Sequence, residues 1–223
     1  MLQEPSVLFH ATLGFFAFSF LASTTYIFND ILDAPSDRIH PIKKHRPIAS
    51  GKISITQSIA IGAMLGMGTI AISLIALPLS FIGILALYTT LNILYTFRAK
   101  KIVYLDIAML ASFYVLRIIA GSAATGIETS AWFFFFAGCF FLNLASMKRV
   151  TELLQHAKEQ ENIAGRGYRK QDASILKSIG FICIAFSCIV LALYITNPHV
   201  TDLYTRPLLL WTLLPLILLW ASR

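Results

Sequence analysis

The chain is strongly apolar: of its 223 residues, 57% are hydrophobic and only 13% are charged. Because soluble domains carry about 25% charged residues, this composition excludes an ordinary soluble enzyme, a disordered protein and a secreted disulfide scaffold. The net charge of +7 is not carried on a soluble basic face, so nucleic-acid binding is excluded as well. The chain is therefore expected to lie largely in lipid.

Seven apolar segments approach the length of a membrane-spanning helix, which needs about 20 residues. Because irregular backbone is not tolerated against lipid, the polar segments between them must lie in water or inside the protein. The sequence therefore predicts an all-α fold, a polytopic membrane helix bundle of about seven transmembrane helices. The predicted spans are 7–29, 54–76, 80–97, 104–124, 131–147, 174–196 and 206–222.

The basic residues predict the orientation of the bundle. All but two of the 18 Lys and Arg residues fall at one end of the predicted helices, mainly in the polar segments 30–53 and 148–173; the exceptions are Arg117 and Arg206. Since cytoplasmic loops are rich in Lys and Arg, we expect this end to face the cytoplasm of a bacterial inner membrane. The same cations are expected to contact membrane lipid and phosphate groups.

A group of acidic residues follows the first predicted span. Asn29, Asp33 and Asp37 are spaced four apart, and Asp30 lies three residues before Asp33. A helix that continues past the bilayer would carry all four on one face, with a kink at Pro35. Clustered carboxylates repel one another, and Mg²⁺ binds few carboxylates together with substrate phosphate oxygens. We therefore expect Asp30, Asp33 and Asp37 to bind Mg²⁺ with support from Asn29, rather than to form a solvated acidic turn.

Basic residues come directly after these acids. Acidic residues that bind a metal ion, followed by basic residues that bind phosphate, are what binding of a metal–diphosphate complex requires. Lys43 and Arg46 follow in the same loop, and Lys100 and Lys101 lie in the next loop at this end of the helices. We expect all four to bind phosphate, although Lys100 and Lys101 could serve only as topology signals.

Three further places carry polar residues at or within the membrane. Tyr95 and Asp106 flank the loop that holds Lys100, and both are candidates for ribose hydroxyls or for the second side of the metal site. An ionisable residue deep in a span is a functional candidate by default. Arg117 is one; the alternatives are a structural Asp–Arg pair and an arginine that snorkels outward to the membrane surface. Lys148 and Arg149, at the membrane edge, are expected to bind phosphate.

The run Asn29-Asp30-xx-Asp33-xxx-Asp37, followed by Arg46-Pro47-Ile-Ala-Ser-Gly51, resembles the first aspartate-rich motif of the UbiA superfamily of intramembrane prenyltransferases. The resemblance covers essentially the whole chain and implies about nine transmembrane helices around a cavity that binds a diphosphate through Mg²⁺. It also implies that 1–223 is a single UbiA-type membrane transferase domain. One further helix is expected before residue 7 and more apolar sequence after Arg223, so the domain would be incomplete at both ends and inactive or barely active alone.

The second Asp-xxx-Asp motif of the aromatic prenyltransferases is replaced here by Tyr95-xxx-Ala-Lys100-xxxxx-Asp106. This pattern resembles the decaprenyl-phosphate phosphoribosyltransferase branch, and the run 165–169 resembles forms fused to a haloacid-dehalogenase-like domain. The branch implies transfer of 5-phosphoribose from phosphoribosyl pyrophosphate to a polyprenyl phosphate, with release of diphosphate. The alternatives are prenyl transfer from a prenyl diphosphate to an aromatic acceptor and, remotely, a transporter. The expected catalytic residues are Asp30, Asp33, Asp37 and Asp106; the expected substrate-binding residues are Asn29, Lys43, Arg46, Tyr95, Lys100, Lys101, Arg117, Lys148 and Arg149.

Overall fold

The computed structural model describes residues 4–156, 167–197, 204 and 206–221, and its regular elements there are all helices. The all-α fold expected from the sequence is confirmed. The elements in chain order are α1 (Pro5–Asp37), η1 (Lys43–His45), α2 (Ile55–Ala76), α3 (Leu79–Phe97), η2 (Ala99–Lys101), α4 (Leu105–Thr125), α5 (Ala131–His156), α6 (Asp172–Thr196), η3 (Pro207–Thr212) and α8 (Leu213–Ala221).

Six helices, α1 to α6, are long and apolar enough to cross a membrane. The seventh expected span, 206–222, differs: in the described residues it is the short 3-10 helix η3 followed by the nine-residue helix α8. Pro215 accounts for part of this break, because it has no N–H to donate to the carbonyl of Trp211. Two helices are longer than expected, since α1 continues to Asp37 and α5 to His156.

Local sequence signals account for several helix ends. Ser54 begins α2 with a capping box: its Oγ accepts the Gln57 N–H at 3.2 Å, and Gln57 Oε1 accepts the Ser54 N–H at 3.0 Å. Pro35 lies within the last turn of α1 without ending it. That helix closes where the Arg38 N–H donates to the Ala34 carbonyl at 3.1 Å. The acidic residues after residue 29 therefore lie on a helix, as the sequence predicts.

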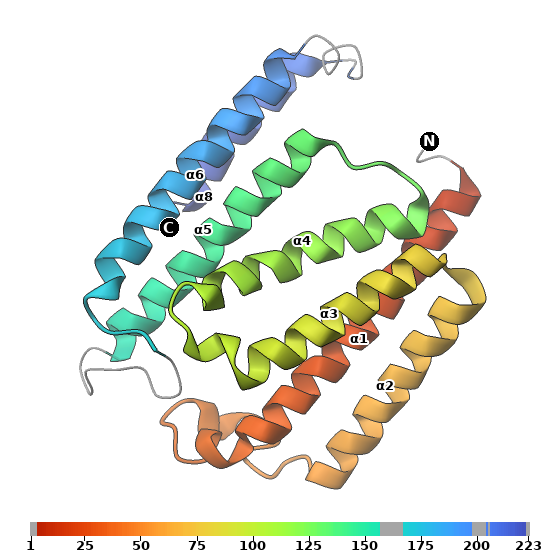
Figure 1. Cartoon of the computed structure of the whole chain (residues 1–223), viewed down its shortest axis with the longest axis vertical. Coiled ribbons are helices and arrows are strands. Elements are labelled where there is room, and N and C mark those ends of the chain that lie inside the picture. The colour runs from red at the N-terminus through yellow and green to blue at the C-terminus, as the bar shows by residue number, and fades with distance from the viewer. Residues whose placement is uncertain (1–3, 157–166, 198–203, 205, 222–223) are drawn as a thin grey trace. The chain divides into compact units, whose positions relative to one another are not determined.

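The chain divides into two compact units, and α1, α2, α3 and the end of α4 form the first. Within it, α2 runs alongside α1 (Figure 1). Two threonine hydroxyls join these helices: Thr69 Oγ1 donates to the Ala17 carbonyl at 3.2 Å, and Thr24 Oγ1 donates to the Gly62 carbonyl at 3.3 Å. Hydroxyl–carbonyl bonds of this kind suit a helix pair in lipid, where no water competes for the polar groups.

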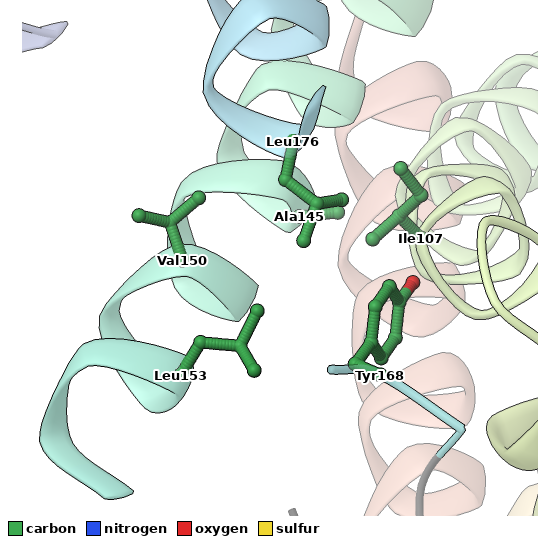
Figure 2. Packing of buried hydrophobic residues seen from close by; sticks show 6 residues of the cluster. All are labelled: Ile107, Ala145, Val150, Leu153, Tyr168 and Leu176. Atoms are coloured by element: carbon green, nitrogen blue, oxygen red, sulfur yellow. The ribbon is translucent and has the colours of Figure 1, made fainter. Parts of the chain in front are cut away.

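The second unit contains the start of α4 together with α5, α6, η3 and α8. Here α5 and α6 lie side by side (Figure 1), joined by a hydrogen bond of 2.8 Å from Asn143 Nδ2 to the Gly180 carbonyl. A hydrophobic cluster forms where α4 begins and α5 approaches its end, and Figure 2 shows its members. They are Ile107, Ala145, Val150, Leu153, Tyr168 and Leu176.

Many large apolar side chains on the long helices are exposed in the described chain. Leu74 on α2 and Phe181 on α6, for example, are each 69% exposed. A soluble protein rarely presents so much apolar surface, whereas lipid solvates it without cost. The helices thus have the surface expected of membrane-spanning segments.

Candidate functional site

Arg46 joins two of the three predicted metal-binding carboxylates. Its Nη1 atom lies 3.1 Å from Asp30 Oδ1 and 2.8 Å from Asp37 Oδ2. The acids are two turns apart on α1, which places them on one face of the helix, and Arg46 reaches them from the loop after η1. The side chain of Asp37 is only 6% exposed, whereas those of Asp30 and Arg46 are 38% and 41% exposed. We call Asp30, Asp33, Asp37 and Arg46 the acid cluster.

Asn29 is held by a residue that the sequence analysis did not single out. Its Oδ1 atom accepts a hydrogen bond of 2.6 Å from Thr96 Oγ1 on α3. Thr96 continues a buried polar stripe along α3, four residues after Asn92 and eight after Tyr88. Within that stripe Asn92 Nδ2 donates to the Tyr88 carbonyl at 3.0 Å. The i, i+4, i+8 spacing was the signal that would have identified Thr96.

The acid cluster suits a divalent cation, although a complete protein ligand set is not formed. Among the described residues no three His, Cys, Asp or Glu side chains are grouped so that they could hold a metal ion. Two carboxylate oxygens nevertheless converge on one cationic nitrogen. Mg²⁺ is usually bound by one or two carboxylates, with water and substrate phosphates completing its shell, so these donors fit it. The inclusion of Asp33 in the metal set stays a prediction.

Three other predicted residues of this unit lie on α4, η1 and α3. Arg117 on α4 is exposed, and its guanidinium carbon stands 5.8 Å from the centre of the Phe18 ring, within the range of a cation–π contact. Lys43 is exposed on η1, and Tyr95 is half-buried on α3.

In the second unit Asp106 and Arg149 form a fully buried ion pair. Both side chains are 0% exposed, with Arg149 Nη2 3.1 Å from Asp106 Oδ1 and Arg149 Nε 2.6 Å from Asp106 Oδ2. The second contact is an attraction of charges without hydrogen-bond alignment. Glu152 adds a carboxylate, which contacts Nη1 of the same guanidinium. The structural Asp–Arg pair considered as an alternative therefore exists, but its arginine is Arg149.

Tyr168 completes this buried group. It is 0% exposed, its ring lies 5.8 Å from the Arg149 guanidinium carbon, and its hydroxyl accepts the Tyr104 N–H at 3.2 Å. Burial raises the pKa of the Tyr168 hydroxyl to about 12, and the negative charge of Asp106, to which this hydroxyl also hydrogen-bonds, adds to the rise. The hydroxyl therefore keeps its proton at neutral pH. We call Asp106, Arg149, Glu152 and Tyr168 the buried ion-pair group.

The predicted phosphate-binding lysines of this unit lie beside that group. Lys100 is half-buried and Lys101 is exposed, both on η2, a few residues before Asp106. Lys148 precedes Arg149 on α5 and is exposed. The second unit thus combines two buried, mutually neutralising charges with more accessible cations near them.

The two groups of polar residues match the motifs that pointed to a family in the sequence. The model of the UbiA prenyltransferase family matches residues 2–223. The chain belongs to this family. The resemblance drawn from the acidic run and from Arg46-Pro47 is therefore confirmed, and with it the reading of the chain as an integral membrane protein of the UbiA type.

Two bacterial relatives show how the UbiA chain compares with longer proteins. An uncharacterized protein, y4nM, of Sinorhizobium fredii is 34% identical over 96% of this chain and 43% of its own length. A decaprenyl-phosphate phosphoribosyltransferase of Corynebacterium glutamicum is 35% identical over 66% of this chain and 44% of its own length. The chain thus spans less than half the length of each.

The fold also resembles that of a solved member of the family. The structure of a UbiA homolog from Archaeoglobus fulgidus, bound to DMAPP and Mg²⁺, superimposes with a TM-score of 0.73. The match covers 96% of this chain and 74% of that one, at 17% sequence identity. At this identity the likeness establishes the UbiA-type helical fold.

Proposed function

We propose that the protein is a Mg²⁺-dependent membrane transferase that moves 5-phosphoribose from phosphoribosyl pyrophosphate to a polyprenyl phosphate and releases diphosphate. The observation that carries this proposal is the make-up of the second unit: its carboxylates Asp106 and Glu152 are both already paired with Arg149, and the same unit carries the cations Lys100 and Lys101. A ligand that bears an additional phosphate suits such a region better than a second metal ion does. Similarity to a decaprenyl-phosphate phosphoribosyltransferase supports the same substrate class.

In the proposed reaction the bond from ribose C1 to the diphosphate oxygen breaks, and its electron pair leaves with diphosphate. An oxygen of the lipid phosphate then forms the new bond to C1. Negative charge develops on the leaving oxygens, so cations fixed near them lower the barrier. The reaction needs no separate nucleophilic side chain, which agrees with a site made of carboxylates and cations.

In the proposed reaction the predicted metal-binding acids and the predicted phosphate-binding cations have different roles. Asp30, Asp33 and Asp37 would hold Mg²⁺, which when bound neutralises phosphate charge and orients the diphosphate. Arg46, already placed between two of these acids, would pass from carboxylate to phosphate as substrate binds. Tyr95 would contact the ribose hydroxyls. The remaining phosphate contacts are proposed for Lys43, Lys100, Lys101, Arg117 and Lys148, with Asn29 orienting the acids.

The test is a direct comparison of two donor–acceptor pairs in membranes that contain the protein. One reaction holds phosphoribosyl pyrophosphate and a polyprenyl phosphate, and the other holds a prenyl diphosphate and an aromatic acid, each with Mg²⁺ or with EDTA. We expect a phosphoribosylated lipid by mass spectrometry in the first reaction, only with Mg²⁺, and its loss in Asp33→Asn at wild-type membrane content. A prenylated aromatic product instead would contradict the proposed donor, and more than a tenth of activity in Asp33→Asn would remove Asp33 from the metal set.

A further inference from the structure

The segment 98–104, which contains η2 and leads into α4, forms a turn with a backbone conformation that needs support. Tyr104 has a φ of +66°, in the left-handed region that non-glycine residues seldom adopt and that aromatic residues enter only at a cost. The turn begins with hydrogen bonds from the Lys101 N–H to the Arg98 carbonyl and from the Ile102 N–H to the Ala99 carbonyl, at 3.1 and 3.0 Å. It also bears Lys100 and Lys101. The position of these cations therefore depends on what holds the turn.

Tyr168 contacts the turn at its strained residue. Its hydroxyl accepts the Tyr104 N–H at 3.2 Å, and the two rings meet edge to face with centroids 6.5 Å apart. Tyr168 is itself fixed, because it lies in the hydrophobic cluster beside Ile107 (Figure 2) and beneath the Arg149 guanidinium. A rigid side chain anchored in the core thus holds the one residue of the turn with an unfavourable φ.

Gly167 contacts the turn at one of the cations. A Cβ atom at this position would stand 2.5 Å from the Lys101 carbonyl oxygen and 3.2 Å from Val103 Cγ2. Real Cβ atoms do not approach a backbone oxygen so closely, so any side chain at residue 167 would displace the backbone of Lys101. Gly167 and Tyr168 are adjacent in sequence and contact the same turn at two points, Lys101 and Tyr104.

We propose that Gly167 and Tyr168 are positioning residues that fix the 98–104 turn and so place Lys100 and Lys101 for the phosphate groups of the substrate. The inference rests on the proposed function in that the ligand is a diphosphate. It adds a role for a segment far from the acidic motif in sequence. In this scheme Asp106 and Arg149 hold Tyr168 in place and do not themselves need to contact substrate.

The test uses the full chain in detergent, with Tyr168→Phe and Gly167→Ala compared with two matched controls. Tyr194→Phe removes a hydrogen-bonded tyrosine hydroxyl of the same unit, whose partner is Tyr204. Gly138→Ala adds a methyl group where nothing lies within 4 Å. Binding of Mg²⁺–pyrophosphate is measured by thermal shift on the monodisperse fraction. The KM of the diphosphate substrate, the KM of the lipid and kcat are measured in turnover.

We expect Tyr168→Phe and Gly167→Ala to weaken pyrophosphate binding and raise the diphosphate KM by about 5- to 30-fold. This is less than the roughly 10- to 150-fold effect of losing a contact to a charged group outright, because the lysines are displaced and not removed. The lipid KM should stay within about twofold and kcat within about threefold, and both controls should match wild type. Three outcomes would overturn the inference: Tyr168→Phe binds pyrophosphate with wild-type affinity, its lipid KM rises as much as its diphosphate KM, or it cannot be recovered folded. Because pyrophosphate binding does not depend on which group is transferred, absence of phosphoribosyl transfer would refute the proposed function alone.

Discussion

A single guanidinium nitrogen of Arg46 offsets the repulsion between Asp30 and Asp37. Asp37 is almost fully buried, so its charge is poorly solvated by water and depends on this partner. Asp30 and Arg46 are more than a third exposed, and contacts at such positions contribute at most about 1 kcal/mol. The arrangement therefore neutralises both acids, and Arg46 can exchange its more exposed contact with Asp30 for a phosphate at little cost.

Replacing Arg46 should make the stability of the protein depend on Mg²⁺. In Arg46→Gln the two carboxylates have lost their shared cation, so we expect the Tm in EDTA to fall by roughly 2–4 °C, the shift for about 1 kcal/mol in a chain of this size. Saturating Mg²⁺ should restore it, because the metal ion takes the place of the guanidinium. Thermal unfolding in detergent measures both effects. Lys52→Gln, which removes an exposed cation of the same loop, should show neither effect. If the Tm of Arg46→Gln is the same with and without Mg²⁺, the metal assignment is contradicted.

At the residue scale the sequence predicts contacts within one helix far better than contacts between helices. The shared face of Asp30 and Asp37 follows from the helical repeat alone. The Asp106–Arg149 pair joins residues 43 positions apart, and nothing in local spacing specifies it. Both residues were predicted to belong to the site, but only the packing of α5 against the start of α4 reveals that each neutralises the other. The contacts of Tyr168 were hidden for the same reason.

At the scale of elements, α1 and the end of α4 approach each other at a glycine. A Cβ atom on Gly14 would stand 2.9 Å from Ala124 Cβ and 3.6 Å from Phe81 Cε2. A β-carbon is fixed to the backbone, so neither Ala124 nor the helix that bears it can yield by a change of rotamer. Small residues allow this close packing, which in membranes supplies much of the attraction between helices.

The variant Gly14→Ala should therefore destabilise the first unit. The added methyl group would force the two helices apart, and overpacking of this kind costs about 1–3 kcal/mol. Gly83→Ala on α3 is the matched control, because a methyl group there would meet nothing within 4 Å and alanine is the better helix former. We expect a lower detergent Tm for Gly14→Ala and an equal or higher one for Gly83→Ala. Equal Tm values for both variants would show that the helices do not rely on this contact.

The helices themselves were largely predictable, because hydropathy and span length reflect the solvent around each segment. The residues at which the helices begin and end were less predictable. Residues 30–37 are too polar to count as membrane span, yet the helical backbone of α1 continues through them and past Pro35. The segment 206–222 has the composition of a span but not its conformation, since η3 and α8 divide it. Backbone hydrogen bonding determines where α1 ends and where the segment 206–222 is interrupted, and amino-acid composition does not reveal it.

At the scale of the whole molecule, successive spanning helices must return the chain to alternate sides of the membrane. The loop after α1, which contains Arg46, then lies on the opposite side from the loop between α4 and α5, residues 126–130. The first of these loops is rich in Lys and Arg, and the second has none. From the distribution of basic residues we propose that the acid cluster faces the cytoplasm, where phosphorylated water-soluble substrates are made.

Site-directed labelling tests this orientation. The native cysteines Cys139, Cys183 and Cys188 would first be replaced by alanine, and a single cysteine introduced as Lys52→Cys or Glu128→Cys, both at exposed loop positions. With a membrane-impermeant maleimide we expect Glu128→Cys to react in right-side-out vesicles and Lys52→Cys only in inside-out vesicles. Retained transferase activity in each variant serves as the control for correct insertion. Reaction of Lys52→Cys in right-side-out vesicles would place the acid cluster on the outer face, where a donor such as phosphoribosyl pyrophosphate could not reach it from the cytoplasm.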